Sequence, residues 1–181
     1  AMRVITGTAR GVKLETVPGQ DVRPTADRVK EGLFSAIHFE LPGRTALDLF
    51  AGSGQLGIEA LSRGASLCVF VDQDRRSQEV IKRNVQAAKV AERARVLQAD
   101  ALSYLARCRE RFDFVFVDPP YRCGQYGEIL TALAPVLAPG GKVLVEGERD
   151  LPLEESYGLL QRQKSYRYGK TVVSLYQKGE E

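Results

Sequence analysis

Apolar residues follow two different spacings along most of the chain. From residue 45 onward, short and mostly apolar runs alternate with segments in which apolar residues recur every three or four positions. The runs predict strands and the periodic segments predict helices. The strands are expected at residues 45–50, 66–71, 94–98, 112–117 and 142–145, and the helices at 56–61, 75–88, 101–106 and 129–137. Strands that are apolar throughout are typical of a parallel sheet with helices on both faces, so the pattern predicts a doubly wound α/β fold.

Two further strands are expected late in the chain, at residues 159–165 and 171–176. Tyr168 and Gly169 join them, so they should pair as an antiparallel hairpin. They bring the predicted sheet to seven strands, most of them parallel.

The pattern before residue 45 is different. Short apolar segments at 4–6 and 11–14 predict a small hairpin with Arg10 near its tip. A helix is expected from Thr25, a suitable N-cap, because Val29, Leu33 and Ile37 recur at helical spacing. We therefore divide the chain into an N-terminal extension, residues 1–44, and a main domain, residues 45–181.

A glycine-rich segment follows the first strand of the main domain. Residues 52–57 read G-S-G-Q-L-G, which matches the G-x-G-x-x-G pattern of dinucleotide-binding turns. Glycines allow positive φ angles and the close approach of a ligand to bare backbone. Asp48, just before the turn, suits a ligand that carries an ammonium group better than it suits a pyrophosphate. A plain turn in an α/β domain is the alternative interpretation.

Acidic residues occur where four of the predicted strands end. In a parallel sheet these ends meet at one edge, where ligands bind. Asp72 lies twenty residues after Gly52, a position from which a carboxylate accepts hydrogen bonds from ribose hydroxyls. NAD and S-adenosylmethionine both carry that diol, so Asp72 does not distinguish them. Hydride transfer commonly needs a histidine as acid–base group, but His38, the one histidine, lies in the predicted N-terminal helix and is expected to be a partly exposed helical residue. The four acids are Asp48, Asp72, Asp100 and Asp118.

The segment after the fourth strand favours methyl transfer. It reads Asp118-Pro119-Pro120-Tyr121. Two prolines make a stiff extended corner whose carbonyls are free to accept hydrogen bonds. An acid beside such a carbonyl matches the two N–H donors of an exocyclic amino group, and a tyrosine offers a ring for base stacking. We therefore predict that these four residues hold a planar amine toward an electrophilic methyl group, with no metal required.

Composition and charge limit the class of protein, the cellular compartment and the partners that are expected. With 44% hydrophobic and 27% charged residues, the chain has ordinary globular composition, and no apolar run reaches the length of a membrane span. Three widely spaced cysteines suggest neither disulfides nor a zinc site, so a cytoplasmic location is expected. The protein is also expected to be a monomer. The net charge of +3 is small, yet basic residues cluster near the N-terminus and again at 162–170, where they alternate with tyrosines. Such clusters suit RNA contact, and a solvated surface is the alternative.

These motifs together resemble a known family. D-L-F-A-G-S-G at 48–54, the acids at 72 and 100, and D-P-P-Y at 118–121 are similar to class I S-adenosylmethionine-dependent N-methyltransferases, which have a Rossmann-like fold. The N-terminal segments R-V-I-T-G-T-A-R-G-V-K-L at 3–14 and R-P-T-A-D-R-V-K-E-G-L-F at 23–34 resemble the RsmD family, bacterial enzymes that methylate guanine N2 in 16S ribosomal RNA.

The resemblance implies roles for individual residues. Asp48 would contact the methionine ammonium, the turn at residues 51–54 would pass under the methionine end, Asp72 would hold the ribose, and Asp100 would accept from the adenine amino group. The cofactor-binding set is Asp48, Ala51, Gly52, Ser53, Gly54, Asp72, Gln73, Asp100 and Ala101. The residues expected to contact RNA, free or within a partly assembled small subunit, are Arg10, Arg23, Thr25 and Arg28.

Several alternative functions stay open at this point. DNA adenine and protein glutamine N-methyltransferases present similar amino groups to a related D/N-P-P-Y corner. A non-catalytic RNA-binding protein would keep the glycine turn and the basic clusters, and a hydride-transferring enzyme is a third alternative. The sequence does not decide whether Asp118 or water takes the proton, and it assigns no role to Asp74.

Overall fold

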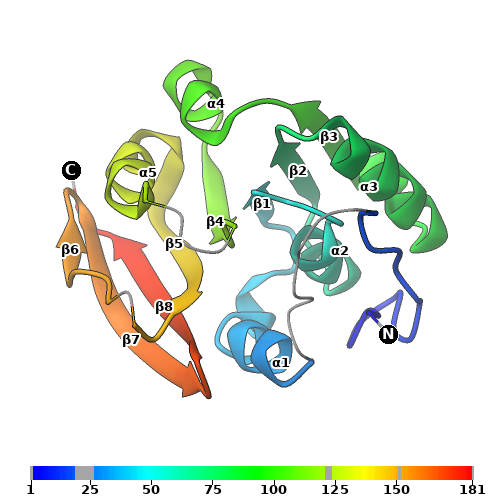
Figure 1. The fold of residues 1–181 in the computed structure, drawn as a ribbon, viewed down its shortest axis with the longest axis horizontal. Helices are drawn as coiled ribbons and strands as arrows, with labels where there is room; N and C mark the ends of the chain where they lie inside the picture. The colour runs from blue at the N-terminus through cyan, green and yellow to red at the C-terminus, as the bar shows by residue number, and fades with distance from the viewer. Residues whose placement is uncertain (1, 19–26, 121–123, 151, 181) are drawn as a thin grey trace.

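The computed structural model describes residues 2–18, 27–120, 124–150 and 152–180 (Figure 1). Three of the predicted site residues, Arg23, Thr25 and Tyr121, lie outside the described residues. Within the described helices, none has both the length and the hydropathy that a membrane span requires.

One mixed sheet of eight strands runs through the molecule in the order β3-β2-β1-β4-β5-β8-β7-β6. The first five strands in the chain pair in parallel, and the last three join them antiparallel. This confirms the doubly wound, mostly parallel α/β prediction. The bounds are β1 Thr45–Leu49, β2 Leu67–Asp72, β3 Ala94–Gln98, β4 Phe112–Val117, β5 Leu137–Glu148, β6 Ser156–Tyr157, β7 Leu160–Tyr168 and β8 Thr171–Lys178.

Helices cover both faces of this sheet (Figure 1). Helices α1, α2 and α3 pack through residues such as Leu33, Ile58 and Ile81 on one face, and α4 and α5 pack through Leu105 and Ile129 on the other. The helices are α1 Asp27–Ser35, α2 Gln55–Ser62, α3 Arg75–Ala87, α4 Ala101–Arg107 and α5 Tyr126–Ala132, with short 3-10 helices at His38–Glu40, Ala91–Arg93 and Ala134–Val136.

The structure differs from the predicted elements in two places of the main domain. Strand β6, which adds an eighth strand to the seven predicted, has only two residues, too few to show an alternating pattern. The helix predicted at 129–137 ends at Ala132, and β5 begins at Leu137. Pro139, Gly140 and Gly141 therefore lie inside a strand, where the pairing with β4 shifts register between Phe112 and Phe114. A β-bulge of this kind accommodates the proline and glycines that were expected to stop a helix.

The N-terminal segment, residues 2–18, packs on α2 and α3 and forms no regular strand. Its antiparallel pairing reduces to one bridge between Arg3 and Lys13, flanked by the hydrogen bond from Val4 N to Val12 O. The buried Glu59 of α2 holds this segment by accepting from the amides of Ile5 (2.9 Å) and Thr6 (3.0 Å). Lys30 and Arg63 lie beside the same carboxylate, at 3.7 and 2.8 Å. The extension is thus fixed to the main domain by a buried charged cluster.

Candidate functional site

The carboxyl ends of β3, β2, β1, β4 and β5 lie next to one another along one edge of the sheet, here called the rim. Leu49 of β1 pairs with Val71 of β2 and with Val117 of β4. The next residues along the chain, Asp72 and Asp118, therefore flank the tip of β1, because neighbouring strands are spaced about 4.8 Å apart. The sheet order brings the predicted glycine turn and the predicted Asp118 corner together.

The glycine turn, residues 51–54, joins β1 to α2 as the sequence predicted. Ala51 N donates to Val71 O (2.9 Å) and Gly54 N donates to Ala51 O (2.7 Å). Gly52 and Gly54 have φ angles of 57° and 84°, which favour glycine. A Cβ added at Gly52 would meet no atom of the described residues within 4 Å. The backbone at Gly52 is therefore open to a ligand.

The third glycine of the motif serves packing. A Cβ at Gly57 would lie 2.4 Å from the Phe70 ring and 2.7 Å from Cys68 Sγ. The absence of a side chain at Gly57 lets α2 pack directly on β2. Gly52 and Gly54 belong to the cofactor-binding set predicted from the sequence and Gly57 does not, and the structure gives Gly57 a packing role.

Asp48 lies under the turn, only 1% exposed. Its Oδ2 accepts from Gly57 N (2.9 Å), so this carboxylate holds the first turn of α2. Burial raises the pKa of Asp48 from 3.8 to about 8; the Gly57 hydrogen bond opposes the shift and the nearby charge of Asp72 adds to it. A buried carboxylate of this kind is stabilised by a cation, so its position suits the predicted contact with an ammonium group, which stays a prediction.

The acids at the ends of β2 and β3 are also held by the chain. Asp72 accepts from Gly52 N (2.9 Å) and Asp74 N (2.8 Å), which ties the tip of β2 to the glycine turn. Asp74, to which the sequence analysis assigned no role, is the N-cap of α3 and pairs with Arg76 at 2.7 Å. Gln73, between them, is exposed.

Asp100 is the N-cap of α4 and accepts from Ser103 N (3.1 Å) and Ser103 Oγ (3.2 Å). Asp100 is exposed, and the adjacent Ala101 is buried in the core beneath α4. The two predicted adenine-side residues therefore lie at the rim, one open to solvent and one packed. Their contact with a cofactor remains a prediction.

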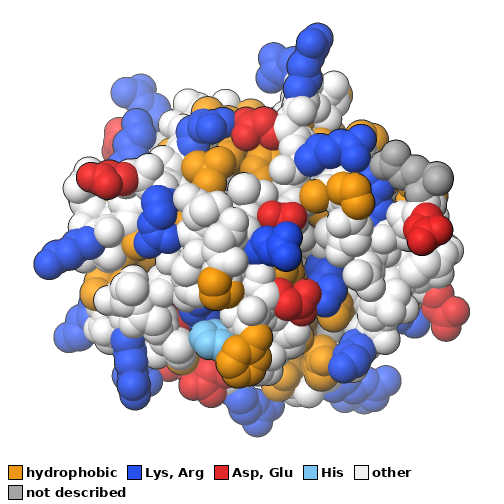
Figure 2. All heavy atoms as spheres, turned by 180° about the vertical axis from the view of Figure 1, so that it is seen from behind, with side chains coloured by type: hydrophobic (Ala, Val, Ile, Leu, Met, Phe, Trp, Pro, Cys, Tyr) orange, Lys and Arg blue, Asp and Glu red, His pale blue; other side chains and the backbone are white. Residues whose placement is uncertain are grey.

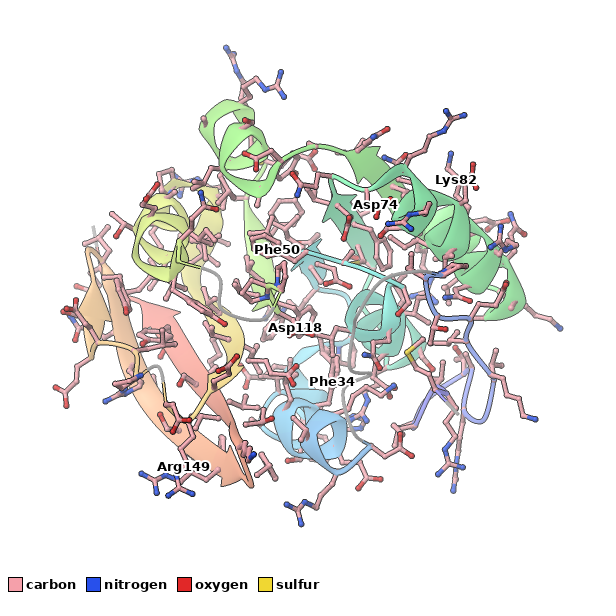
Figure 3. All side chains as sticks on the ribbon, in the orientation of Figure 1. Phe34, Phe50, Asp74, Lys82, Asp118 and Arg149 are labelled. Atoms are coloured by element: carbon pink, nitrogen blue, oxygen red, sulfur yellow. The ribbon has the colours of Figure 1, made fainter. Side chains whose placement is uncertain are left out.

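The Asp118 corner follows β4 directly. Asp118 is half-buried, Pro119 is buried and Pro120 is exposed. Figure 3 shows Asp118 below Phe50, near the centre of the molecule. Phe50 has a φ angle of 60°, a conformation that bulky side chains rarely adopt and that concentrates at functional sites. Sequence reasoning missed Phe50, because nothing in the sequence marks a strained backbone at a non-glycine residue.

A further residue missed from the sequence is Asn84, which lies on α3 and is 1% exposed. Its Nδ2 donates to the carbonyls of Ser53 (2.8 Å) and Glu15 (3.0 Å), and its Oδ1 accepts from Glu15 N (2.8 Å). The Ser53 hydroxyl also contacts Met2 Sδ at 3.5 Å. One side chain thus joins the N-terminal segment to the glycine turn.

The predicted RNA-contacting residues that can be described lie on the N-terminal extension. Arg10 is exposed. Arg28 of α1 is also exposed, with its guanidinium 5.6 Å from the centre of the Tyr168 ring. A Cβ at Gly32 would lie 1.7 Å from the Tyr168 hydroxyl, so α1 is packed closely against β7. Two basic clusters that are far apart in the sequence meet at this contact.

The late cluster divides between the two faces of the sheet. Lys164 and Tyr166 pair with Leu175 and Val173, which face α1, whereas Arg167 pairs with Val172. Successive side chains of a strand point to opposite faces, so the tyrosines and the arginines do not alternate on one surface as the sequence suggested.

His38 does not lie at the rim. It belongs to the 3-10 helix His38–Glu40, and its Nδ1 is 3.2 Å from Arg63, which follows the far end of α2. Figure 2 shows the chain's one histidine on the face turned away from Figure 1. This position disfavours the hydride-transfer alternative.

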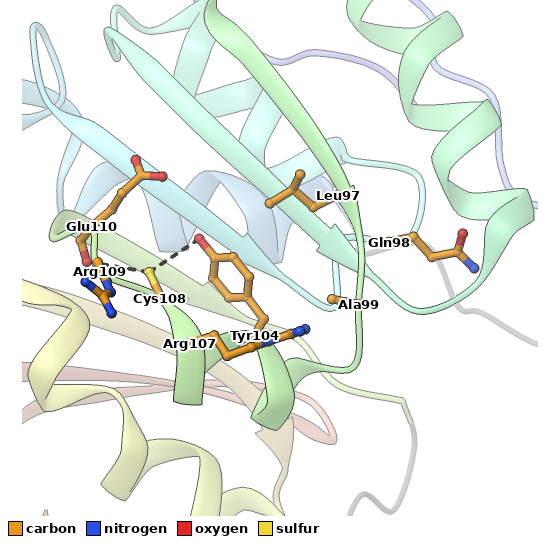
Figure 4. Close-up of a pocket in the computed structure, with 8 residues that line it drawn as sticks. All are labelled: Leu97, Gln98, Ala99, Tyr104, Arg107, Cys108, Arg109 and Glu110. Carbon is orange, nitrogen blue, oxygen red and sulfur yellow. Dashed lines mark hydrogen bonds between the residues drawn. The ribbon is translucent and has the colours of Figure 1, made fainter.

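A surface hollow of about 420 Å³ lies between β3 and the end of α4 (Figure 4). Cys108 Sγ donates to Tyr104 Oη (3.5 Å) within it, and burial is the main cause that raises the Tyr104 pKa. None of the predicted site residues lines this hollow. We therefore place the candidate site at the rim, where the motif residues converge.

Comparisons with known proteins identify related methyltransferases. A family model described as Conserved hypothetical protein 95 matches residues 2–177. YlbH of Bacillus subtilis, a putative rRNA methyltransferase, is 39% identical over 98% of this chain and 99% of its own length. Ribosomal RNA small subunit methyltransferase D of Escherichia coli K12 is 37% identical over 98% of this chain and 90% of its own.

Solved structures give the same result. The putative methyltransferase yhhF from Escherichia coli superposes with a TM-score of 0.86, at 35% identity over 99% of both chains. A putative methylase from Haemophilus influenzae superposes with a TM-score of 0.83, at 33% identity over 98% of both chains. The match extends through the N-terminal extension and the C-terminal hairpin as well as the central sheet.

Proposed function

This chain belongs to the RsmD family of ribosomal RNA methyltransferases, and from that premise we propose that it transfers the methyl group of S-adenosylmethionine to the exocyclic N2 of a guanine in 16S ribosomal RNA. The observation that carries the proposal is the pairing of Leu49 with Val117. This pairing sets the Asp118 corner beside the glycine turn, so an amine at the corner would face a ligand on the turn.

The residues at the rim fit the cofactor. Gly52 offers open backbone, and the buried Asp48 gains from a cationic partner. Gln55 Oε1, at the start of α2, is buried without a hydrogen-bond partner in the structure and suits a donor from a ligand. We assign the ammonium to Asp48, the ribose diol to Asp72 and the adenine amino group to Asp100. When bound, S-adenosylmethionine supplies an electrophilic methyl group on a good leaving group.

The protein's own task is alignment of the amine. Guanine N2 is a poor nucleophile because its lone pair is delocalised into the ring. Two N–H donors of N2 directed at the Asp118 carboxylate and the Pro119 carbonyl orient the lone pair and stabilise the positive charge that develops on nitrogen. Asp118 or water then takes the proton, and Tyr121 supplies a stacking surface for the flipped base.

The RNA partner is proposed on the same basis. We assign residues 1–44 as an RNA-contacting extension of the domain at residues 45–181, with Arg10, Arg23, Thr25 and Arg28 as contacts. The meeting of Arg28 with Tyr168 supports this assignment, since it joins the extension to the basic hairpin. The substrate is 16S ribosomal RNA, free or in a partly assembled subunit, and the enzyme acts as a cytoplasmic monomer.

One experiment tests the proposal. The protein is incubated with methyl-labelled S-adenosylmethionine and small-subunit RNA, with and without ribosomal proteins, and the modified base is mapped. Label on guanine N2 is the expected result. Label on adenine or on protein would contradict the substrate assignment, and an absence of label with intact RNA binding would indicate a non-catalytic RNA-binding protein. Stabilisation by NADH instead of S-adenosylhomocysteine would contradict the cofactor.

A further inference from the structure

A second hollow, of about 260 Å³, lies on the hairpin side of the sheet, away from the glycine turn. It is formed by the end of β5, the loop after it, and strands β7 and β8; we call it the hairpin groove. Six residues that line it carry the argument: Gly147, Arg149, Arg162, Ser165, Arg167 and Ser174.

The strand register explains why these side chains share one face. Arg167 pairs with Val172 and Ser165 pairs with Ser174, while Val172 also pairs with Gly147 of β5. Paired residues of neighbouring strands point to the same face. Gly147 has no side chain and Ser174 is small and 98% buried, since only 2% of it is exposed. Small residues in the middle of the sheet and arginines at its edge therefore produce a concave, basic surface.

The charges in the hairpin groove are not balanced within the protein. Arg162 is held in place, since its Nη1 donates to Leu153 O (3.1 Å) and its Nη2 lies 3.8 Å from Glu155. Arg149 and Arg167 are exposed and make no side-chain hydrogen bond or ion pair with other residues of the structure. Glu148 also lines the groove, and with Glu155 beside Arg162 the three guanidinium groups and two carboxylates leave a net charge of +1.

The hydroxyl groups add directional donors to this charge. Ser165 Oγ lies 3.4 Å from Ser174 Oγ at the floor of the groove. Guanidinium groups beside hydroxyl groups are the usual partners of phosphate oxygens in nucleic-acid complexes.

The groove opens close to the rim. Val145 of β5 pairs with Val117, the residue before Asp118. Gly147 lies two residues beyond Val145, about 7 Å further along the strand. A strand of RNA that presents a base at the Asp118 corner would therefore pass the groove within a few nucleotides.

We infer that the hairpin groove binds backbone phosphates of the RNA strand that flanks the target guanine. The inference rests on the proposed function, and it adds a contact surface on β5, β7 and β8 to the N-terminal extension. The contacts are to phosphate, so they position the strand and carry no base specificity.

Paired double substitutions test this inference. Arg149→Ala with Arg167→Ala removes the two unpaired cations of the groove, and Arg107→Ala with Arg109→Ala removes the same charge from the hollow beside α4. Binding of transcribed small-subunit RNA is measured at several KCl concentrations. In the groove variant, the negative slope of log K against log[KCl] should become shallower by about 1.4, because each phosphate contact on a single strand contributes about 0.7. The affinity for RNA should fall about tenfold. The control variant should keep the wild-type slope.

Lysine substitutions check that the change in RNA binding comes from the lost charge and not from a loss of folding. Arg149→Lys with Arg167→Lys should restore the slope, and both double variants should keep the wild-type melting temperature. Equal losses in the groove and control variants, or an unchanged slope in the groove variant, would overturn the inference. Methyl transfer by the wild-type protein is scored separately, so a protein that binds RNA through the groove without transferring methyl contradicts only the proposed function.

Discussion

The glycine-turn side of the rim and the hairpin side are built in opposite ways. On the glycine-turn side, the acids Asp48, Asp72 and Asp100 each accept a hydrogen bond from a backbone amide. On the hairpin side, Arg149 and Arg167 extend into solvent without a partner in the structure. One side has its polar groups fixed by the fold, and the other has charge on long side chains.

The difference matches two kinds of ligand. Carboxylates held by backbone amides keep their positions before a ligand arrives, which suits a small molecule bound in one orientation. Long basic side chains adapt to the path of a polyanion and gain affinity from counterion release. The structure thus separates polar groups held by the fold from charges on exposed side chains.

The largest expected effect is at the point where the two sides meet. Asp118→Ala should lower methyl transfer about a thousandfold, because the acceptor for the developing charge on the amine is lost. S-adenosylhomocysteine affinity, measured by calorimetry, should stay within about twofold of wild type. Asp113→Ala, at the other end of the same strand, is the control and should retain transfer. Near-normal turnover by the Asp118 variant would exclude the proposed role.

The glycine-turn side should respond strongly to pH through Asp48. Its carboxyl must lose a proton to pair with an ammonium group, and its pKa is raised to about 8. S-adenosylhomocysteine affinity should therefore rise about tenfold per pH unit from pH 6 toward pH 8. Asp48→Asn should bind weakly with no such dependence. A flat profile for the wild-type protein would show that Asp48 does not face the ammonium group.

The Asp48 carboxyl also determines whether the free energy of unfolding rises or falls with pH when no ligand is bound. Because the folded-state pKa lies above the ordinary value of 3.8, the folded protein holds the extra proton between about pH 4 and pH 8. The free energy of unfolding should therefore fall as pH rises through that window, relative to Asp48→Asn. Urea unfolding of both proteins at several pH values measures the difference.

Two glycines of one motif should give different phenotypes. Gly57→Ala places a Cβ 2.4 Å from the Phe70 ring and should cost about 2 kcal/mol of stability by overpacking. Gly52→Ala meets open space, so it should cost only about 1 kcal/mol for its positive φ, while weakening cofactor binding. Thermal unfolding and calorimetry separate the two. Equal loss of stability in both variants would mean that the turn has no ligand-facing position.

The smallest expected effect concerns the connection between the extension and the turn. Asn84→Asp keeps the shape and removes the donors to Ser53 and Glu15, so cofactor affinity should fall about fivefold, or about 1 kcal/mol. Ser77→Ala, a buried polar change elsewhere on α3, is the control. Unchanged affinity in Asn84→Asp would show that Asn84 anchors the N-terminal segment alone.

Much of the fold could be predicted because the strands are continuous apolar runs. The bounds of β3 and β4 agree with the predicted 94–98 and 112–117. The start of β5 was wrong because residues 134–137 are apolar, and a helix and a buried strand share that pattern over so few residues. The bulge at Gly140 depends on pairing with β4, which a local pattern does not contain.

Some residues of the site could be predicted from the sequence and others could not, for a similar reason. Asp72 and Asp118 are marked in the sequence by their place after a predicted strand, and Asp48 is marked by its place before the glycine turn. Asn84 and Arg149 are not marked in this way, because their roles depend on which distant backbone segment lies opposite them, and Arg167 was noted only as part of the basic cluster at 162–170. Tertiary pairing decides such roles, and no spacing rule within one helix or strand would reveal them.

The position of β8 has a consequence for biosynthesis. This strand lies between β5 and β7, so β7 joins the sheet only through residues 171–178. A growing polypeptide would complete the sheet from β1 to β5 while β7 has only the two-residue β6 to pair with. Until β8 emerges from the translating ribosome, β7 and its Arg167 would not be joined to β5, so the glycine turn would form before the hairpin groove.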